Sequence, residues 1–335
     1  MAARTPGRWL GHFGWIAAAA LMATAVPGCD EDFDPSSTLN SLRVLAVRAD
    51  EPYPKPGTTV HLEMLWHDGK APADEPRAVQ ILWIGGCFDP AGDLYYGCYP
   101  QFATLFAADG KPTPEGMKYV STGSSFDLEI PSDVITRRPT QEGVEPYGVS
   151  FVFFLACAGT IKPLEDPAAD VLPLGCFDAE GKQLGEEDFV PGYLSLYSYD
   201  ARTNANPILN GLAIGGSSYP EGASIPDTHI PGCGQGSCPK ASVKALIDPA
   251  SAEIDPGATD PEGRQLSEQM WVNYYTTAGK LTKAARLVND ALKGWNEDNG
   301  VELEPPAPGE TFYVYTVVHD NRGGIAWAKR RVVTD

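Results

Sequence analysis

The pattern that most constrains the fold is a period-two alternation of apolar and polar residues, which recurs in short runs. In residues 60–67 the apolar Val60, Leu62 and Met64 alternate with polar residues, and the same pattern recurs at 126–130. Successive side chains of a strand point to opposite faces, so this alternation predicts half-buried strands. The chain also contains 30 Pro and 35 Gly, which suit many short strands joined by turns. The sequence therefore predicts an all-β fold of antiparallel sheets.

The strand-like runs fall into two groups, which predicts two antiparallel β-sandwich domains. The first is expected over residues 39–200, with a long disulfide-tied loop at 162–191 inserted between its last two strands. The second is expected over residues 201–335. We place the boundary in the polar segment 200–207, because this segment follows one strand-like run and precedes another.

Three local patterns refine this prediction. Trp83 is a candidate for the buried tryptophan of a third sandwich strand, and Trp271 is a candidate for its counterpart in the second domain. The strand-like runs 311–318 and 325–333 flank a turn rich in Asp, Asn and Gly, which predicts a β-hairpin. Apolar residues between 281 and 295 instead recur at helical spacing, so that a short helix and an irregular insert between strands both remain open there.

Residues 1–28 have the features of an export signal. Two arginines precede an apolar run at 15–26, which is too short to span a bilayer but suits the core of a signal peptide. The segment 26–29, Val-Pro-Gly-Cys, resembles a bacterial lipobox, in which cleavage before the cysteine accompanies its lipidation. Ordinary secretory cleavage after 23–25, Ala-Thr-Ala, is the competing interpretation.

The cysteine count favours lipidation. Of the seven cysteines, ordinary cleavage leaves an odd number, whereas lipidation of Cys29 leaves six that can all pair. We therefore expect Cys29 to be lipidated and the acidic segment 29–38 to act as a tether, so that the exported protein is anchored in the bacterial cell envelope. Sequence does not choose among the pairings of the six, but proximity suggests three disulfides: Cys87–Cys98, Cys157–Cys176 and Cys233–Cys238.

Several segments resemble those of a group of bacterial lipoproteins of uncharacterised activity. They are Leu42–Asp50 with Pro56-Gly57, Cys157-Ala-Gly159, Gly175-Cys176, Phe189-Val190, Gly192-Tyr193, Asn206-Pro207 and Asp320–Gly324. The domains of that group resemble immunoglobulin-like or PKD-like sandwiches. The resemblance implies an immunoglobulin-like fold and an envelope location, and it brings no catalytic residues to this chain.

Charge and motifs exclude several functional classes. The formal net charge is −19 and no basic stripe is present, so nucleic acid is not an expected partner. The sequence lacks the G-x-S-x-G, H-E-x-x-H, Walker A and EF-hand patterns, and we expect no enzyme activity. The acidic composition favours solubility over a specific cation site.

Two sets of residues are candidates for ligand binding. Asp200 and Asn204, with Asn206, gather oxygen ligands at the expected domain junction, which suggests calcium as the one cofactor to consider. Tyr95, Tyr96 and Tyr99 are candidate exposed aromatics, although core-capping tyrosines would give the same pattern.

We therefore expect a non-enzymatic envelope lipoprotein that acts as a binding, scaffold or adhesion module. Its expected contacts are the membrane, through the lipid, and an envelope protein or glycan. Two alternatives remain open. One is a hydrolase of glycans or peptides that uses acidic residues, and the other is a purely structural spacer.

Overall fold

A computed structural model describes residues 35–71, 75–107, 111–139, 142–164, 173–220, 226–234, 236 and 238–335. Residues Pro35–Asp335 form one compact unit. The predicted signal peptide, Cys29 and most of the predicted tether lie outside the described residues. Among the helices of the described part of the chain, none is long and apolar enough to cross a membrane.

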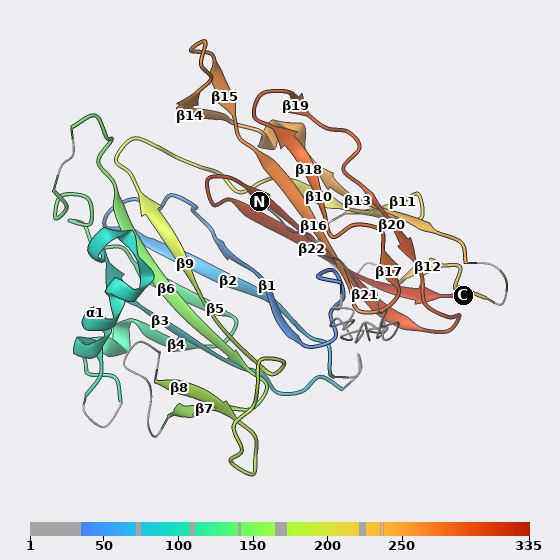
Figure 1. Ribbon diagram of the computed structural model, residues 1–335, viewed down its shortest axis with the longest axis horizontal. Coiled ribbons are helices and arrows are strands. Elements are labelled where there is room, and N and C mark those ends of the chain that lie inside the picture. Colours follow the sequence, from blue (N-terminus) through green and yellow to red (C-terminus); the bar gives the residue numbers. More distant parts are fainter. Residues whose placement is uncertain are drawn as a thin grey trace, which may run out of the picture. The chain divides into compact units, whose positions relative to one another are not determined.

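The first sandwich consists of two antiparallel sheets, coloured blue to yellow in Figure 1. One sheet has the order β1-β2-β5 and the other the order β4-β3-β6-β9. Their bounds are β1 Leu42–Ala49, β2 Thr59–Asp68, β5 Ser125–Glu129, β4 Val120–Thr122, β3 Gln80–Phe88, β6 Gly148–Cys157 and β9 Phe189–Ser198. This distribution of consecutive strands between two sheets is the Greek key of immunoglobulin-like domains. The expected fold class is confirmed.

The core of the first sandwich is built around Trp83 on β3. Its side chain is fully buried, and its ring lies 6.0 Å from the ring of Phe126 and 5.9 Å from that of Phe154. The indole Nε1 donates a hydrogen bond to the carbonyl of Gly123 at 2.7 Å, which satisfies its buried polar atom. Trp83 therefore occupies the position that the sequence predicted for it.

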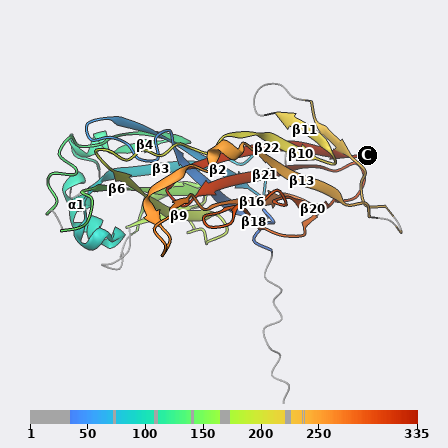
Figure 2. The ribbon, with the colours of Figure 1, turned by 90° about the horizontal axis from the view of Figure 1, so that it is seen from above.

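The second sandwich repeats this architecture with an added parallel strand (Figures 1 and 2). Its sheets have the orders β11-β10-β13-β20-β17 and β12-β22-β21-β16-β18-β19. β12 pairs with β22 in parallel. The bounds are β10 Leu209–Ile214, β11 Ser217–Pro220, β12 Thr228–Ile230, β13 Ala241–Ile247, β16 Met270–Thr276, β17 Lys280–Leu281, β18 Ala285–Asp290, β19 Gly294–Trp295, β20 Val301–Glu304, β21 Thr311–Asp320 and β22 Ile325–Thr334. β21 and β22 form the predicted hairpin.

The proposed role of Trp271 is wrong. Trp271 is half-buried, and its ring stacks on His319 at 5.2 Å. The neighbouring Tyr274 fills the core instead, fully buried, and its hydroxyl donates to the carbonyl of Asn299. Alternation along β16 (Met270–Thr276) places positions 271 and 274 on opposite faces. Tyr274 therefore faces the core of the second sandwich and Trp271 does not.

The segment 281–295 contains strands rather than a helix. β17, β18 and β19 lie within residues 280–295. Asp290 turns the chain between the last two, because its carboxylate accepts hydrogen bonds from the backbone N–H groups of Leu292 and Lys293. Val288 is fully buried whereas Leu292 is 67% exposed. The helical spacing of the apolar residues therefore arose from turns between short strands.

The remaining elements lie in the connections. They are η1 Ala91–Asp93, η2 Tyr95–Cys98, α1 Tyr99–Leu105, η3 Gly116–Lys118, β7 Thr160–Pro163, β8 Leu174–Phe177, η4 Pro249–Ser251, β14 Ile254–Thr259 and β15 Gln265–Ser267. The predicted loop 162–191 is thus interrupted by the β7–β8 ribbon and ends within β9. The predicted boundary between residues 200 and 201 falls between β9 and β10, and the assignment of two separate domains stays a prediction.

An apolar cluster joins the two sandwiches. Leu45 and Ala46 of β1 pack with Tyr315 and Val317 of β21, together with Leu39. The segment before β1 is also hydrogen-bonded to the second sandwich. The N–H of Leu39 donates to the carbonyl of Thr276, at the end of β16, at 3.0 Å. The outer face of one sheet in each sandwich is therefore buried by the other sandwich.

Candidate functional site

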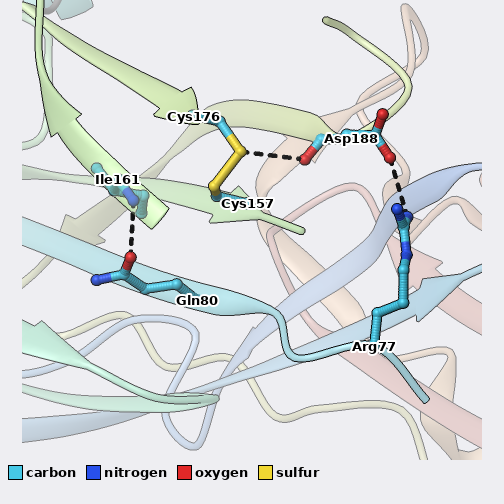
Figure 3. Close-up of a disulfide and its surroundings, with 6 residues drawn as sticks. All are labelled: Arg77, Gln80, Cys157, Ile161, Cys176 and Asp188. Atoms are coloured by element: carbon cyan, nitrogen blue, oxygen red, sulfur yellow. Dashed lines mark hydrogen bonds and ion pairs between the residues drawn. A yellow bond between two sulfur atoms is a disulfide. The ribbon is translucent and has the colours of Figure 1, made fainter. Parts of the chain in front are cut away.

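The six remaining cysteines form the three pairs that proximity suggested, Cys87–Cys98, Cys157–Cys176 and Cys233–Cys238. Figure 3 shows how the second disulfide joins the β7–β8 ribbon to the end of β6. The backbone N–H of Ile161 donates to the side chain of Gln80 at 2.7 Å in the same region (Figure 3). This ribbon is thus held against the sheet by covalent and polar contacts.

The Cys87–Cys98 disulfide closes a loop that carries the predicted aromatic residues. Tyr95 and Tyr96 lie in η2 and are 39% and 54% exposed. The ring of Tyr95 stacks on that of Tyr193 at 4.9 Å, and the ring of Tyr96 packs edge-on against Tyr95 at 5.7 Å. We call Tyr95, Tyr96 and Tyr193 the tyrosine cluster. Tyr99 is different, because it is partly buried against the core beneath α1.

The tyrosine cluster rests on a rigid base. Tyr193, which is 48% exposed on the edge strand β9, lies 5.7 Å from each of the rings of Phe151 and Phe153 on β6. Both phenylalanines are buried. Alternation in residues 193–199 indicated that Tyr193, Tyr197 and Tyr199 share a face, but no sequence signal linked Tyr193 to the Cys87–Cys98 loop.

A cavity of about 480 Å³ is lined by residues 88–93, at the start of the Cys87–Cys98 loop, and by residues 137–139 and 147. Arg138 is one of the residues that line it. Nη1 of Arg138 donates to Oδ1 of Asp89 at 3.1 Å and to Oδ1 of Asp93 at 2.7 Å, and Nη2 donates to Oδ2 of Asp93 at 3.0 Å. The guanidinium also lies 4.3 Å from the ring centroid of Tyr147. We call this space the Arg138 cavity.

The two carboxylates of the Arg138 cavity differ in their environment. The side chain of Asp89 is only 8% exposed, and burial raises its pKa. Hydrogen bonds from Arg138 lower the pKa of Asp93, whose Oδ2 also accepts from the hydroxyl of Tyr147 at 2.6 Å. The hydrogen bond to Asp93 in turn raises the pKa of Tyr147.

The backbone at both aspartates is unusual. Asp89 has φ 47° and Asp93 has φ 55°, and these are the two non-glycine residues of the described chain with positive φ. Such residues are strained relative to the common regions of φ/ψ space. Oδ1 of Asp89 accepts from the N–H of Val149 at 2.8 Å, but its Oδ2 is buried with no hydrogen-bond partner. Strain and an unpaired buried oxygen together mark a functional candidate.

The sequence motif that contains Asp89 occurs twice, and the two aspartates make different contacts. Residues 86–92 read Gly-Cys-Phe-Asp-Pro-Ala-Gly and residues 175–181 read Gly-Cys-Phe-Asp-Ala-Glu-Gly. In the second copy Oδ1 of Asp178 accepts from the N–H groups of Glu180 and Lys182. This is an ordinary aspartate-stabilised turn. The two segments are therefore alike in sequence and different in environment.

The predicted calcium ligands are placed at the linker. Asn206 donates from Nδ2 to the carbonyl of Ala49 at 2.7 Å and accepts at Oδ1 from the N–H of Ile325 at 2.8 Å. Oδ1 of Asn204 accepts from Nη2 of Arg322 at 2.6 Å, while Asp200 is exposed. A calcium ion would have to displace these donors, one of them a guanidinium, and calcium at this position stays a prediction.

Sequence reasoning missed a buried polar cluster next to this linker. The side chains of Arg322 and Glu268 are 5% and 1% exposed, and Nε of Arg322 lies 2.5 Å from Oε1 of Glu268. Nη2 of Arg322 also donates to Oε2 of Glu253 at 2.8 Å. Among the described residues one group of His, Cys, Asp or Glu side chains is close enough together to hold a metal: Cys233, Cys238 and Glu304. The two sulfurs form a disulfide and offer no thiolate.

Comparisons with known proteins do not assign the chain to a family. No protein-family model matches it, and no curated protein is similar to it. Among solved structures, the fibronectin(III)-like modules of Clostridium thermocellum CbhA are 8% identical, with a TM-score of 0.19, and the match covers 86% of this chain and 95% of theirs. Murine CEACAM1b is 8% identical, with a TM-score of 0.20, over 87% of this chain and 99% of its own. Scores this low carry no inference about function.

Proposed function

We propose that the protein is an exported, non-enzymatic lipoprotein of the bacterial envelope that binds a partner through its tyrosine cluster. The observation that carries the proposal is the packing of three exposed tyrosines: Tyr95 and Tyr96 of a disulfide-closed loop lie against each other, and Tyr95 stacks on Tyr193 of β9. Tyrosine is enriched at interfaces because it offers a large apolar area, few rotatable bonds and a polar end. A scaffold that fixes these rings in advance lowers the entropy cost of binding.

Export is supported by the disulfides, and the lipid anchor extends that argument. Three disulfides indicate an oxidising compartment outside the cytoplasm. Lipidation of Cys29 would leave every other cysteine paired. We expect Cys29→Ser to release the protein from the membrane fraction of the native cells. Unchanged membrane association of that variant would refute the anchor without affecting the binding surface.

The alternatives are less well supported. A purely structural spacer needs neither an exposed aromatic cluster nor a cavity. A hydrolase that uses two carboxylates needs one to transfer a proton and the other to act as base or nucleophile. Asp89 and Asp93 line one cavity and have opposite pKa shifts, but Nη1 of Arg138 is bonded to both. This guanidinium lies between the carboxylates and favours binding over catalysis.

The proposal is tested by cross-linking in native cells, followed by affinity capture and mass spectrometry. The wild-type protein is compared with a variant in which Tyr95, Tyr96 and Tyr193 are changed to Ala. Truncation of hot-spot tyrosines costs about 2 kcal/mol or more, so we expect recovery of the partner to fall at least about tenfold. The matched control replaces Ile254 and Leu292, which are 59% and 67% exposed on the second sandwich, with Ala. Equal recovery from the tyrosine variant and the control would refute the proposal.

A further inference from the structure

We propose that the Arg138 cavity binds a neutral saccharide unit, with its hydroxyl groups paired to Arg138, Asp93 and Tyr147. This rests on the proposed binding function and gives it a ligand class. The cavity, of about 480 Å³, falls within the range of about 300–1,000 Å³ that is typical of small-molecule sites. Asp93, which lines it, is two residues from Tyr95 of the tyrosine cluster. The Cys87–Cys98 loop therefore contributes residues to both the cavity and the cluster.

The first argument is the unfavourable environment of Asp89, whose Oδ1 accepts a hydrogen bond from Arg138 in the wall of the cavity. The side chain of Asp89 is 8% exposed, and its Oδ2 has no hydrogen-bond partner. An unpaired buried carboxylate oxygen is costly, commonly about 1–3 kcal/mol or more. The backbone at this residue is also held at a positive φ of 47°. Both costs are expected where a fold positions a group for a ligand rather than for stability alone.

The second argument is a set of unused donors on Arg138, which lines the cavity. A guanidinium has five N–H groups, and three of those of Arg138 bond to Asp89 and Asp93. Nε–H and one N–H of Nη2 make no hydrogen bond to the residues that the structure describes, and we assign them to the ligand. The hydroxyl of Tyr147 donates to Asp93, so its oxygen can still accept. Donors and acceptors thus alternate over a short distance, as they do along the hydroxyls of a sugar ring.

The third argument concerns charge. Arg138 is paired with Asp89 and Asp93, and Arg137 with Asp133. Because these arginines and aspartates lie next to each other, a cation in the cavity would be repelled by the guanidinium groups and an anion by the carboxylates. A neutral ligand with both donors and acceptors avoids both penalties. Proline side chains and the ring of Tyr147 supply apolar walls for the carbon face of such a ligand.

The test uses the purified protein and a panel of methyl glycosides of glucose, galactose, mannose and N-acetylglucosamine. Binding is detected by saturation-transfer NMR and quantified by calorimetry. We expect at least one glycoside to bind to the wild-type protein. Asp89→Asn removes the charge that positions Nη1 of Arg138 in the wall of the cavity, and since hydrogen bonds to charged groups are worth about 1.5–3 kcal/mol, the affinity should fall about tenfold or more.

Two further variants separate binding from folding. Ala91 lines the cavity and is exposed, so Ala91→Trp fills the space without touching the Arg138 hydrogen bonds, and it too should abolish glycoside binding. Asp178→Asn is the matched control, because it changes the same position of the repeated motif in a loop whose aspartate only stabilises a turn. This control should bind as the wild type does.

Several outcomes would overturn the saccharide assignment. These are the absence of binding by every glycoside, binding that Ala91→Trp leaves unchanged, or binding of calcium chloride or inorganic phosphate in this cavity in place of glycosides. The proposed function is judged separately, by partner recovery from the tyrosine variant. Tyrosine-dependent capture without glycoside binding would remove only the saccharide assignment. Glycoside binding without tyrosine-dependent capture would remove only the partner surface.

Discussion

At the scale of single residues, the most informative group is the pair Arg322 and Glu268. Both side chains are almost fully buried. The guanidinium of Arg322 donates hydrogen bonds to the carboxylates of Glu268 and Glu253 and to the amide oxygen of Asn204. Three acidic side chains therefore compete for one cation, since Asp320 lies close enough to act on Glu268. Burial, with a smaller effect of Asp320, raises the pKa of Glu268 from 4.5 to about 7.

This pKa predicts how Glu268 affects stability. Because the folded-state value lies above the unfolded one, the folded protein holds this proton more firmly, and the stabilisation is complete below the ordinary pKa and lost as pH rises to about 7. Between about pH 5 and about pH 8 we expect the free energy of unfolding of the wild type to fall by about 2–3 kcal/mol relative to that of Glu268→Gln. Urea unfolding at both pH values measures this difference.

The control for this experiment is Glu262→Gln, because the side chain of Glu262 is 68% exposed. Its stability should follow that of the wild type at every pH. If the wild type and Glu268→Gln show parallel pH dependence, Glu268 is ionised throughout this range and the prediction is wrong.

At the scale of elements, the sequence predicted what depends on local pattern. Trp83 and the β21–β22 hairpin were found because strand alternation and turn chemistry act over a few residues. The possible helix in the segment 281–295 was wrong for the same reason. Turns between strands of two and six residues place apolar residues at a spacing that resembles the helical period. The exposed part of the tyrosine cluster, Tyr95 and Tyr96, was a candidate from sequence.

The Arg138 cavity was beyond sequence reasoning, because its members are distant in the chain. Asp89 and Arg138 are separated by 49 positions, and Asp93 and Tyr147 by 54. They meet because β3 and β6 are neighbours in one sheet, which brings Val149 and Asp89 into hydrogen-bonding distance. A repeated Gly-Cys-Phe-Asp motif was visible in the sequence, but only the tertiary environment distinguishes its two copies.

At the scale of the whole molecule, the contact between the sandwiches explains an unusual burial pattern. Strand β21 is buried at Val314, Tyr315, Thr316, Val317 and Val318, although a sandwich strand normally exposes alternate residues. The outward-facing positions are covered by the first sandwich. There the hydroxyl of Tyr315 lies 3.0 Å from Nδ1 of His67. Burial, followed by the charge of Lys329, lowers the pKa of that histidine to about 4, so His67 is neutral in this contact.

Because of this contact, we expect the two sandwiches to unfold in one transition. A single charge buried in the contact should divide that transition into two. Val317 is fully buried in the contact, and Val317→Asp leaves the core of each sandwich intact. An uncompensated buried charge costs about 3–5 kcal/mol. We therefore expect calorimetry to show one transition for the wild type and, for Val317→Asp, a lower first transition that is resolved from a second.

The matched control is Leu287→Asp. Leu287 pairs with Trp271, and Trp271 with His319, so Leu287 lies on the same face of the same sheet as Val317. It is 36% exposed and outside the contact, so the same charge should leave one transition near that of the wild type. If Val317→Asp instead behaves as this control does, or lowers a single transition without splitting it, the sandwiches are not coupled through this face.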